Sequence, residues 1–173
     1  SSGQQSRHYG RIEQLFAGGE LLTTRGYLQL PPYPASGAGP DLRHLVLGSE
    51  GRMGVLTKVV VRISPLPEKD DIYAVFFPSW DNSKQAVQAL AASGTRFSML
   101  RLSNPMETTT NLALAGHERE IAWLNRYLNI RGISQPEACM CLVGFTGSRN
   151  QVRSARSEAV SLFRPFKGVS VGT

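Results

Sequence analysis

The stretch DLRHLVLGSEGRMGVLTKVVVRISPLP, residues 41–67, decides how the chain is interpreted. Three glycines, Gly48, Gly51 and Gly54, are spaced three apart and precede a run rich in β-branched residues. Apolar residues in the segment 55–63 alternate with the period of a half-buried strand, and Pro65 follows them. Because glycine has no Cβ, the backbone at these glycines can turn sharply or approach a ligand closely. The stretch therefore predicts a tight turn that leads into a strand.

The glycine turn has two possible roles. A glycine-rich turn with exposed backbone amides can bind phosphate, and the same glycines can serve a purely structural turn. The spacing differs from the G-x-G-x-x-G of dinucleotide-binding folds, and a strand follows where those folds have a helix. Both interpretations stay open on spacing alone.

Length and composition indicate a globular protein. The 173 residues suffice for one domain or two small ones. No run of apolar residues is long enough for a transmembrane helix, and the N-terminal segment lacks the apolar core of a signal peptide. Cys139 and Cys141, one residue apart, are expected to stay reduced in a cytoplasmic protein. The histidines are far apart and predict no metal site.

The formal net charge is +6, and basic residues concentrate near the C-terminus. They are Arg149, Arg153, Arg156, Arg164 and Lys167. Such a cluster can bind phosphate or nucleic acid. A solvated helix face is the favoured interpretation, because no aromatic residues alternate with the basic ones.

Residues 12–67 predict a small β-rich region. Two strands are expected within 12–30, with a corner at Gly26, followed by a loop at 31–40. Asp41 is expected to cap a short helix that ends at Leu47. The glycine turn and its strand come next, and the charged segment 68–71 marks a predicted domain boundary.

The region after this boundary predicts the order β-α-β-α-α-β-α-β. Strands are expected at 72–78, 97–102, 138–145 and 169–171, and helices at about 82–93, 105–114, 118–128 and 149–163. Asp81 or Asn82 is expected to cap the first of these helices, and Ser148 with Gln151 the last. This order is typical of a ferredoxin-like antiparallel sheet, here expected to have helices on one face. The predicted class is α+β.

Two segments carry a family resemblance. SGQQSRHYGRIEQL, residues 2–15, resembles S-G-x-x-x-x-x-Y-G-x-I-E-D, and GSEGRMGVLT, residues 48–57, resembles G-S-E-G-T-L-G-V-I-T. Both patterns belong to FAD-linked oxidases of the p-cresol methylhydroxylase and vanillyl-alcohol oxidase superfamily. Within this superfamily, the chain most resembles the branch of the alkyldihydroxyacetonephosphate synthase type. In this superfamily the flavin receives a hydride from a hydroxy acid or, in the synthase branch, forms a covalent adduct with a phosphorylated substrate.

The resemblance implies a division of roles along the chain. Residues 1–68 would be the C-terminal part of a PCMH-type FAD-binding domain, and residues 69–173 the N-terminal part of the cap that binds a small-molecule substrate. The implied FAD contacts are Ser1, Ser2, Gly3, Glu50, Gly51, Arg52, Met53, Gly54, Val55, Leu56 and Arg101. Arg101 lies in SMLRLSN, residues 98–104, which resembles S-I-R-L-x-D. Its alternative interpretation is a surface arginine at a strand end.

The chain departs from the family pattern in places. Arg52 replaces the usual Thr, where a cation would either pair with the FAD pyrophosphate or crowd it, and Asn104 replaces Asp. The first phosphate loop and the later cap segment with a catalytic tyrosine have no counterpart here, so no catalytic residue is expected and the isolated chain is expected to be inactive. The missing N-terminal half of the FAD domain would be its partner. The alternative is a stand-alone ferredoxin-like module that binds a ligand or a protein without catalysis.

Overall fold

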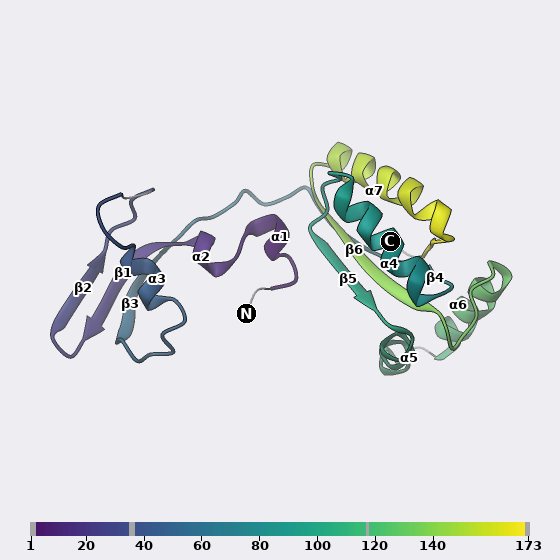
Figure 1. Ribbon diagram of the computed structural model, residues 1–173, viewed down its shortest axis with the longest axis horizontal. Coiled ribbons are helices and arrows are strands. Elements are labelled where there is room, and N and C mark those ends of the chain that lie inside the picture. The colour runs from purple at the N-terminus through teal and green to yellow at the C-terminus, as the bar shows by residue number, and fades with distance from the viewer. Residues whose placement is uncertain (1–2, 35–36, 117, 172–173) are drawn as a thin grey trace. The chain divides into compact units, whose positions relative to one another are not determined.

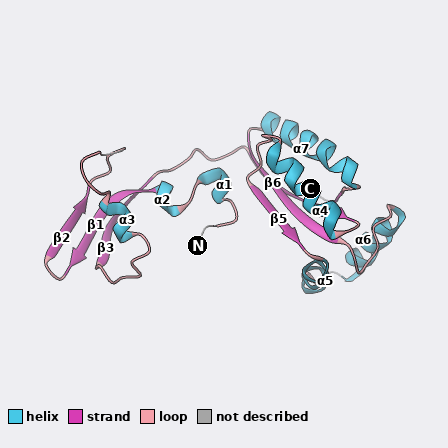
Figure 2. Cartoon of the chain, viewed as in Figure 1, coloured by secondary structure: helices cyan, strands magenta, loops and turns pink. Residues whose placement is uncertain are grey.

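The computed structural model describes residues 3–34, 37–116 and 118–171. Its contacts divide the chain between Leu66 and Pro67 into an N-terminal unit and a C-terminal unit, which are described separately (Figure 1). Both units combine helices with antiparallel strands, which confirms the predicted α+β class (Figure 2). Among the described residues, no helix combines the length and apolar character needed to cross a membrane.

The N-terminal unit is a three-stranded antiparallel sheet with short helices. The helices are α1 (Ser6–Tyr9), α2 (Ile12–Leu15) and α3 (Leu42–Val46), and the strands are β1 (Phe16–Thr23), β2 (Gly26–Leu30) and β3 (Val55–Val61). The strand order is β2-β1-β3. The prediction of strand from residue 12 onward is wrong at its start. The side chain of Gln14 accepts a hydrogen bond from the Arg11 amide at 2.9 Å, which favours one helical turn there.

The core of the N-terminal unit is small. It consists of Phe16, Leu21, Leu30 and Val46. The prediction that β3 is half-buried is wrong, because Val55 is 67% exposed and Val59 50%. In the described part of the chain, β3 lies at the edge of the sheet and has β1 as its one paired strand, while α3 contacts β1. The alternation of apolar residues predicted the strand correctly. Burial of one face of that strand, however, requires a helix or sheet packed over it.

The C-terminal unit is a four-stranded antiparallel sheet with helices. Its elements are β4 (Lys69–Phe77), α4 (Trp80–Ala92), β5 (Met99–Ser103), α5 (Pro105–Leu114), α6 (Glu118–Ile130), β6 (Cys139–Gly147), α7 (Arg149–Phe163), the 3-10 helix η1 (Arg164–Phe166) and β7 (Val169–Val171). The strand order is β5-β6-β4-β7, with every neighbouring pair antiparallel. This is the order of a ferredoxin-like sheet, as the sequence predicted.

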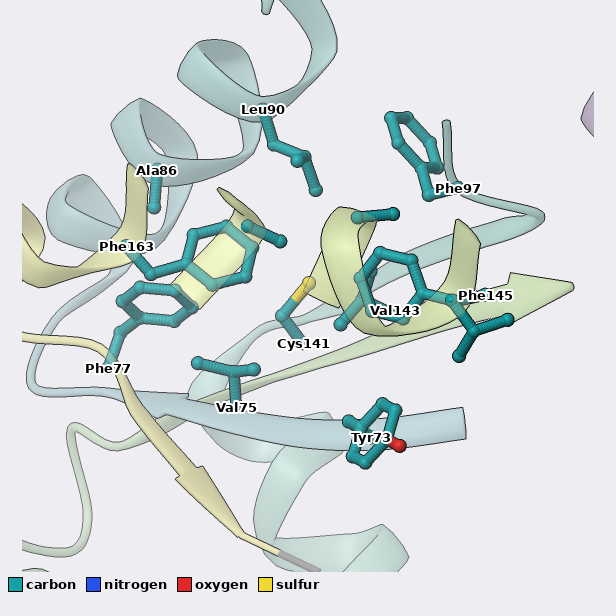
Figure 3. Packing of buried hydrophobic residues seen from close by; sticks show 13 residues of the cluster. Tyr73, Val75, Phe77, Ala86, Leu90, Phe97, Cys141, Val143, Phe145 and Phe163 are labelled. Carbon is teal, nitrogen blue, oxygen red and sulfur yellow. The ribbon is translucent and has the colours of Figure 1, made fainter. Parts of the chain in front are cut away.

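The two faces of this sheet are covered differently. On one face, alternate residues of β4 and β6 pack against α4 and α7, which lie side by side in Figure 1. Tyr73, Val75 and Phe145 belong to this core, and the ring of Phe77 meets that of Phe163 edge-on (Figure 3). The opposite face has a second core, in which β4, β6 and β7 pack against α6; its buried members are Phe76, Leu128, Ile133, Ala138, Met140 and Val169. The prediction of helices on one face only is therefore wrong.

Local capping sets where the helices begin. Ser148 Oγ accepts from the Gln151 amide at 3.3 Å, and Gln151 Oε1 accepts from the Ser148 amide at 2.9 Å, which confirms the predicted capping box of α7. The predicted cap of α4 at Asp81 or Asn82 is wrong. Ser79 Oγ accepts from the Asn82 amide at 3.2 Å, so the helix begins two residues earlier than a cap at Asp81 would place it.

Thr108 of α5 joins the helix to the sheet. Its side chain is fully buried; Oγ1 accepts from the Met140 amide at 3.0 Å and lies 3.3 Å from the Ser103 carbonyl, to which it donates. Ser103 and Met140 face each other in the β5–β6 pair. The hydroxyl therefore satisfies backbone groups that the ladder leaves unpaired.

We expect Thr108→Val to destabilise the C-terminal unit by about 1–3 kcal/mol, because an isosteric methyl leaves buried backbone groups without a hydrogen bond. Urea unfolding followed by tryptophan fluorescence measures this unit, since both Trp80 and Trp123 belong to it. Thr110→Val is the matched control, because the Thr110 hydroxyl is exposed and donates to the Met106 carbonyl of its own helix. Equal effects of the two substitutions would contradict the role given to Thr108.

Candidate functional site

The glycine turn, residues 48–54, connects α3 to β3. The backbone is left-handed at Gly48 (φ 79°), Glu50 (φ 51°) and Gly51 (φ 80°). Within the turn the Arg52 amide donates to the Ser49 carbonyl at 3.0 Å, and the Gly54 amide donates to the Gly51 carbonyl at 3.4 Å. The closely spaced left-handed residues make the chain curl on itself before the strand begins.

This curl leaves backbone donors unused. The amides of Glu50, Gly51 and Met53 have no acceptor among the residues that the structure describes. Beside them is a hollow of about 430 Å³, lined by Leu45, Gly48, Ser49, Glu50, Arg52 and Met53. Exposed amides at such a turn, next to an exposed arginine, have the chemistry to bind an anionic group.

The glycines of the turn differ in whether the fold has room for a side chain at their positions. A Cβ on Gly54 would overlap the backbone carbonyl oxygen of Leu22, so this glycine permits close approach of β1. A Cβ on Gly48 or Gly51 would meet nothing within 4 Å. The space over Gly51 is therefore open to a group that approaches the backbone, and this arrangement fits an FAD phosphate. The sheet alone accounts for Gly54.

The other sequence-predicted FAD contacts are distributed as follows. Ser1 and Ser2 lie outside the described residues, and Gly3 is exposed. Val55 and Leu56 are the first residues of β3, where they pair with Leu22 and Leu21 of β1, and their side chains are exposed. Of the predicted contacts, Glu50, Arg52 and Met53 line the hollow, and Gly51 lies in the same turn.

Arg43 anchors the helix that leads into the turn, and sequence reasoning did not single it out. Its guanidinium bonds to both carboxylate oxygens of Asp41 and donates to the carbonyls of Ala17 (3.1 Å) and Tyr33 (3.0 Å). Asp41 also accepts from the Arg43 amide at 3.0 Å, as the predicted cap of α3. These bonds to Arg43 lower the pKa of Asp41 from 3.8 to about 2. One arginine therefore ties α3 to β1 and to the segment after β2.

Arg101 belongs to the other unit. It lies on β5 opposite Leu142 of β6, so it shares the sheet face that is turned away from α4 and α7. Its Nη2 donates to Glu107 Oε1 at 2.7 Å, and both side chains are about 40% exposed. Asn104, a departure from the family's Asp, caps α5 by accepting from the Glu107 amide at 2.8 Å. An amide oxygen serves this cap as a carboxylate would.

The two cysteines carry no reactive thiol. Both are free and buried, and they occupy alternate positions of β6, so their side chains lie on the same face of the sheet. Burial raises the pKa of Cys141 to about 12, so its thiol stays protonated at neutral pH. These side chains belong to the packing of the sheet.

Comparison with known proteins decides the family. The family description "FAD linked oxidases, C-terminal domain" matches residues 66–172, which is nearly the whole C-terminal unit. The chain belongs to the FAD-linked oxidase family. Individual relatives align with this FAD-linked oxidase chain over the N-terminal unit as well.

Three relatives show the extent of this similarity. The alkyldihydroxyacetonephosphate synthase of Dictyostelium discoideum is 30% identical over 179 residues, which cover 100% of this chain and 29% of the synthase. The synthase of Trypanosoma brucei brucei is 28% identical and covers 99% of the chain and 29% of its own length. A solved alkyldihydroxyacetonephosphate synthase superposes with a TM-score of 0.87 at 29% identity, over 99% of this chain and 31% of that one. This FAD-linked oxidase chain spans less than a third of these relatives.

We expect Gly54→Ala to lower the free energy of unfolding of the N-terminal unit by more than about 3 kcal/mol. The new methyl group would overlap the β1 backbone. Gly51→Ala should cost only about 1 kcal/mol, the penalty of a left-handed residue in open space. Hydrogen exchange of the β1 and β3 amides, measured by mass spectrometry, tests this order. Equal losses of protection in the two variants would contradict the claim that β1 crowds Gly54 and leaves Gly51 free.

We expect Arg43→Gln to raise the pKa of Asp41 from about 2 toward 3.8, measured by NMR titration of the carboxylate. Since the folded pKa is depressed, the stabilisation is full above pH 3.8 and is lost as pH falls toward about 2. The variant should therefore lose less stability over this acid range. Arg52→Gln, at an exposed arginine of the same unit, is the control and should leave the pKa of Asp41 in place. An unchanged pKa of Asp41 in Arg43→Gln would contradict the claim that Arg43 lowers it.

Proposed function

We propose that this chain contributes to an FAD-dependent oxidoreductase or transferase similar to alkyldihydroxyacetonephosphate synthase. Residues 1–68 would form the end of its flavin-binding domain, and residues 69–173 the beginning of its substrate-binding cap. The family match over residues 66–172 and the relatives aligned along the whole chain support this division. The activity and substrate of the whole protein are part of the proposal.

The observation that carries the flavin role is the set of unused amides in the glycine turn. The N–H groups of Glu50 and Met53 belong to residues that line the hollow, and the Gly51 N–H lies between them in the same turn. A Cβ added to Gly51 would meet nothing within 4 Å, so the space beside its backbone is open. In our proposal these donors hold the FAD pyrophosphate, with the Arg52 guanidinium adding a charge-assisted bond. Bound FAD would supply the redox chemistry, and the protein would supply position and charge.

Arg101 is proposed as the contribution of the cap. It projects from the sheet face opposite α4 and α7, and Glu107 holds it through one terminal nitrogen. A guanidinium has five N–H donors, so others remain for a ligand while the ion pair orients the group. In our proposal Arg101 faces the flavin side of the cap and binds an anionic group there.

A second candidate is a ligand-binding module without catalysis. It is favoured by the C-terminal unit, which has a buried core on each face of a ferredoxin-like sheet and thus the elements of an independent domain. Binding of a small molecule to this unit with no contribution from the glycine turn would support this candidate.

Titration of the ¹⁵N-labelled 173-residue chain with FAD tests the flavin role. The turn supplies contacts to one part of the cofactor, so we expect weak binding in the millimolar range, with shifts at the amides of Glu50, Gly51 and Met53. Gly51→Val should abolish these shifts. Gly132→Val is the matched control, because Gly132 has nearly the same φ (78° against 80°) and equally open surroundings, but lies in the C-terminal unit.

Two outcomes would contradict this proposal. Shifts that remain in Gly51→Val would show that the turn amides do not hold the cofactor. Submicromolar FAD binding by this chain would contradict the expectation that the turn contacts only one part of the cofactor, and would indicate a more enclosed flavin site.

A further inference from the structure

A pocket of about 370 Å³ in the C-terminal unit lies between β4 and the beginning of α7. β4 contributes Lys69, Asp71 and Tyr73, which alternate along the strand and so share one face. α7 contributes Arg149, Arg153 and Arg156, at helical spacings of four and three that place them on one side. The pocket is therefore built from one strand face and one helix face, about 80 residues apart in the sequence.

The strand that borders the pocket, β4, has different described neighbours along its length. Within the described residues, β7 pairs with β4 at Ala74, Val75 and Phe76. The preceding part of β4, from Lys69 to Tyr73, pairs with β6 on one side and has no described strand on the other. The first turns of α7 border this part of β4.

The pocket carries four cationic side chains and one carboxylate. Asp71 lies 3.3 Å from the Tyr73 hydroxyl, which donates to it, and 4.0 Å from Lys69 Nζ. The nearby Glu68 carboxylate accepts from the Arg149 backbone amide at 3.1 Å, and so is engaged at the start of the helix. Among the residues that the structure describes, Asp71 and Glu68 thus leave two of the four positive charges of the pocket without a counter-charge.

Two features of the pocket arginines favour ligand binding: one guanidinium is held in place by an aromatic ring, and two others have donors that no described residue uses. The Arg156 guanidinium lies 4.1 Å from the centre of the Tyr73 ring, a cation–π contact that restricts its motion. The side chains of Arg149 and Arg153 have no hydrogen-bond or ion-pair partner within the described ranges 3–34, 37–116 and 118–171. Their planar forks match the oxygen geometry of a phosphate group.

We propose that this pocket binds a small compound with a multiply charged phosphate group, such as a diphosphate. Several uncompensated cations around a concave site favour a ligand with more than one negative charge. The volume lies within the range of small-molecule sites, roughly 300–1,000 Å³. This site is distinct from the glycine turn, and the proposal does not depend on flavin binding.

The structure argues against nucleic acid as the ligand of this pocket. Tyr73 is only 5% exposed and is covered by Arg156, so no aromatic surface is free for a base to stack on. Arg164 and Lys167, the remaining members of the basic cluster in the sequence, lie at the other end of α7 and do not line the pocket. The basic cluster therefore divides into a pocket-lining part and a separate part.

Calorimetric titration of the 173-residue chain with inorganic pyrophosphate, at constant ionic strength, tests the proposal. We expect saturable binding at one site. The double variant Arg149→Gln with Arg153→Gln should weaken it by at least about tenfold, because it removes two charge-assisted contacts. The control, Arg164→Gln with Lys167→Gln, removes the same charge outside the pocket and should change the affinity by less than about twofold.

Tryptophan-detected unfolding midpoints of both double variants confirm that they remain folded, which is expected since Arg149 and Arg153 are exposed. Absence of saturable pyrophosphate binding by the wild-type chain would overturn the proposal. An equal loss in the control would also overturn it, because net charge and not the pocket would then be responsible. A single-stranded DNA oligonucleotide that binds more tightly than pyrophosphate, and more weakly to the control variant, would show a nucleic-acid surface in its place.

Discussion

The antiparallel pairing of β4 with β6 is the constraint on which the C-terminal unit depends. The register runs from Lys69 opposite Gly147 to Phe77 opposite Cys139, and it assigns alternate residues to the two faces of the sheet. A shift by one residue would move Tyr73 and Val75 out of the core under α4 and α7. The same register places Leu142, and with it Arg101 of β5, on the opposite face. Core, cationic pocket and Arg101 are thus consequences of one ladder.

The glycine turn depends on a different kind of constraint, which is close backbone approach. Gly54 brings the chain against Leu22 of β1, and Arg43 ties α3 to the same strand through the Ala17 carbonyl. The two ends of the turn are therefore attached to β1. In our proposal, this attachment positions the unused amides for the FAD pyrophosphate.

The sequence predicted the features whose causes are local. The capping box of Ser148 and Gln151, the cap at Asp41 and the order of strands and helices all depend on residues a few positions apart. Competing caps were harder to separate, since Ser79 lies only two residues before Asp81 and offers an equally suitable oxygen. In the glycine turn, spacing predicted the bend but did not separate Gly54, which the sheet requires, from Gly51, which faces open space.

By itself, the sequence determined the α+β class, the turn and the family resemblance, because periodicity, capping and motif spacing are properties of neighbouring residues. Only the tertiary structure decided that β3 is an exposed edge, that α6 covers the second sheet face, and that three arginines of α7 meet Lys69. Those outcomes depend on which elements pack together. Burial and charge clustering are properties of surfaces brought into contact by folding, and a linear pattern does not specify its partner.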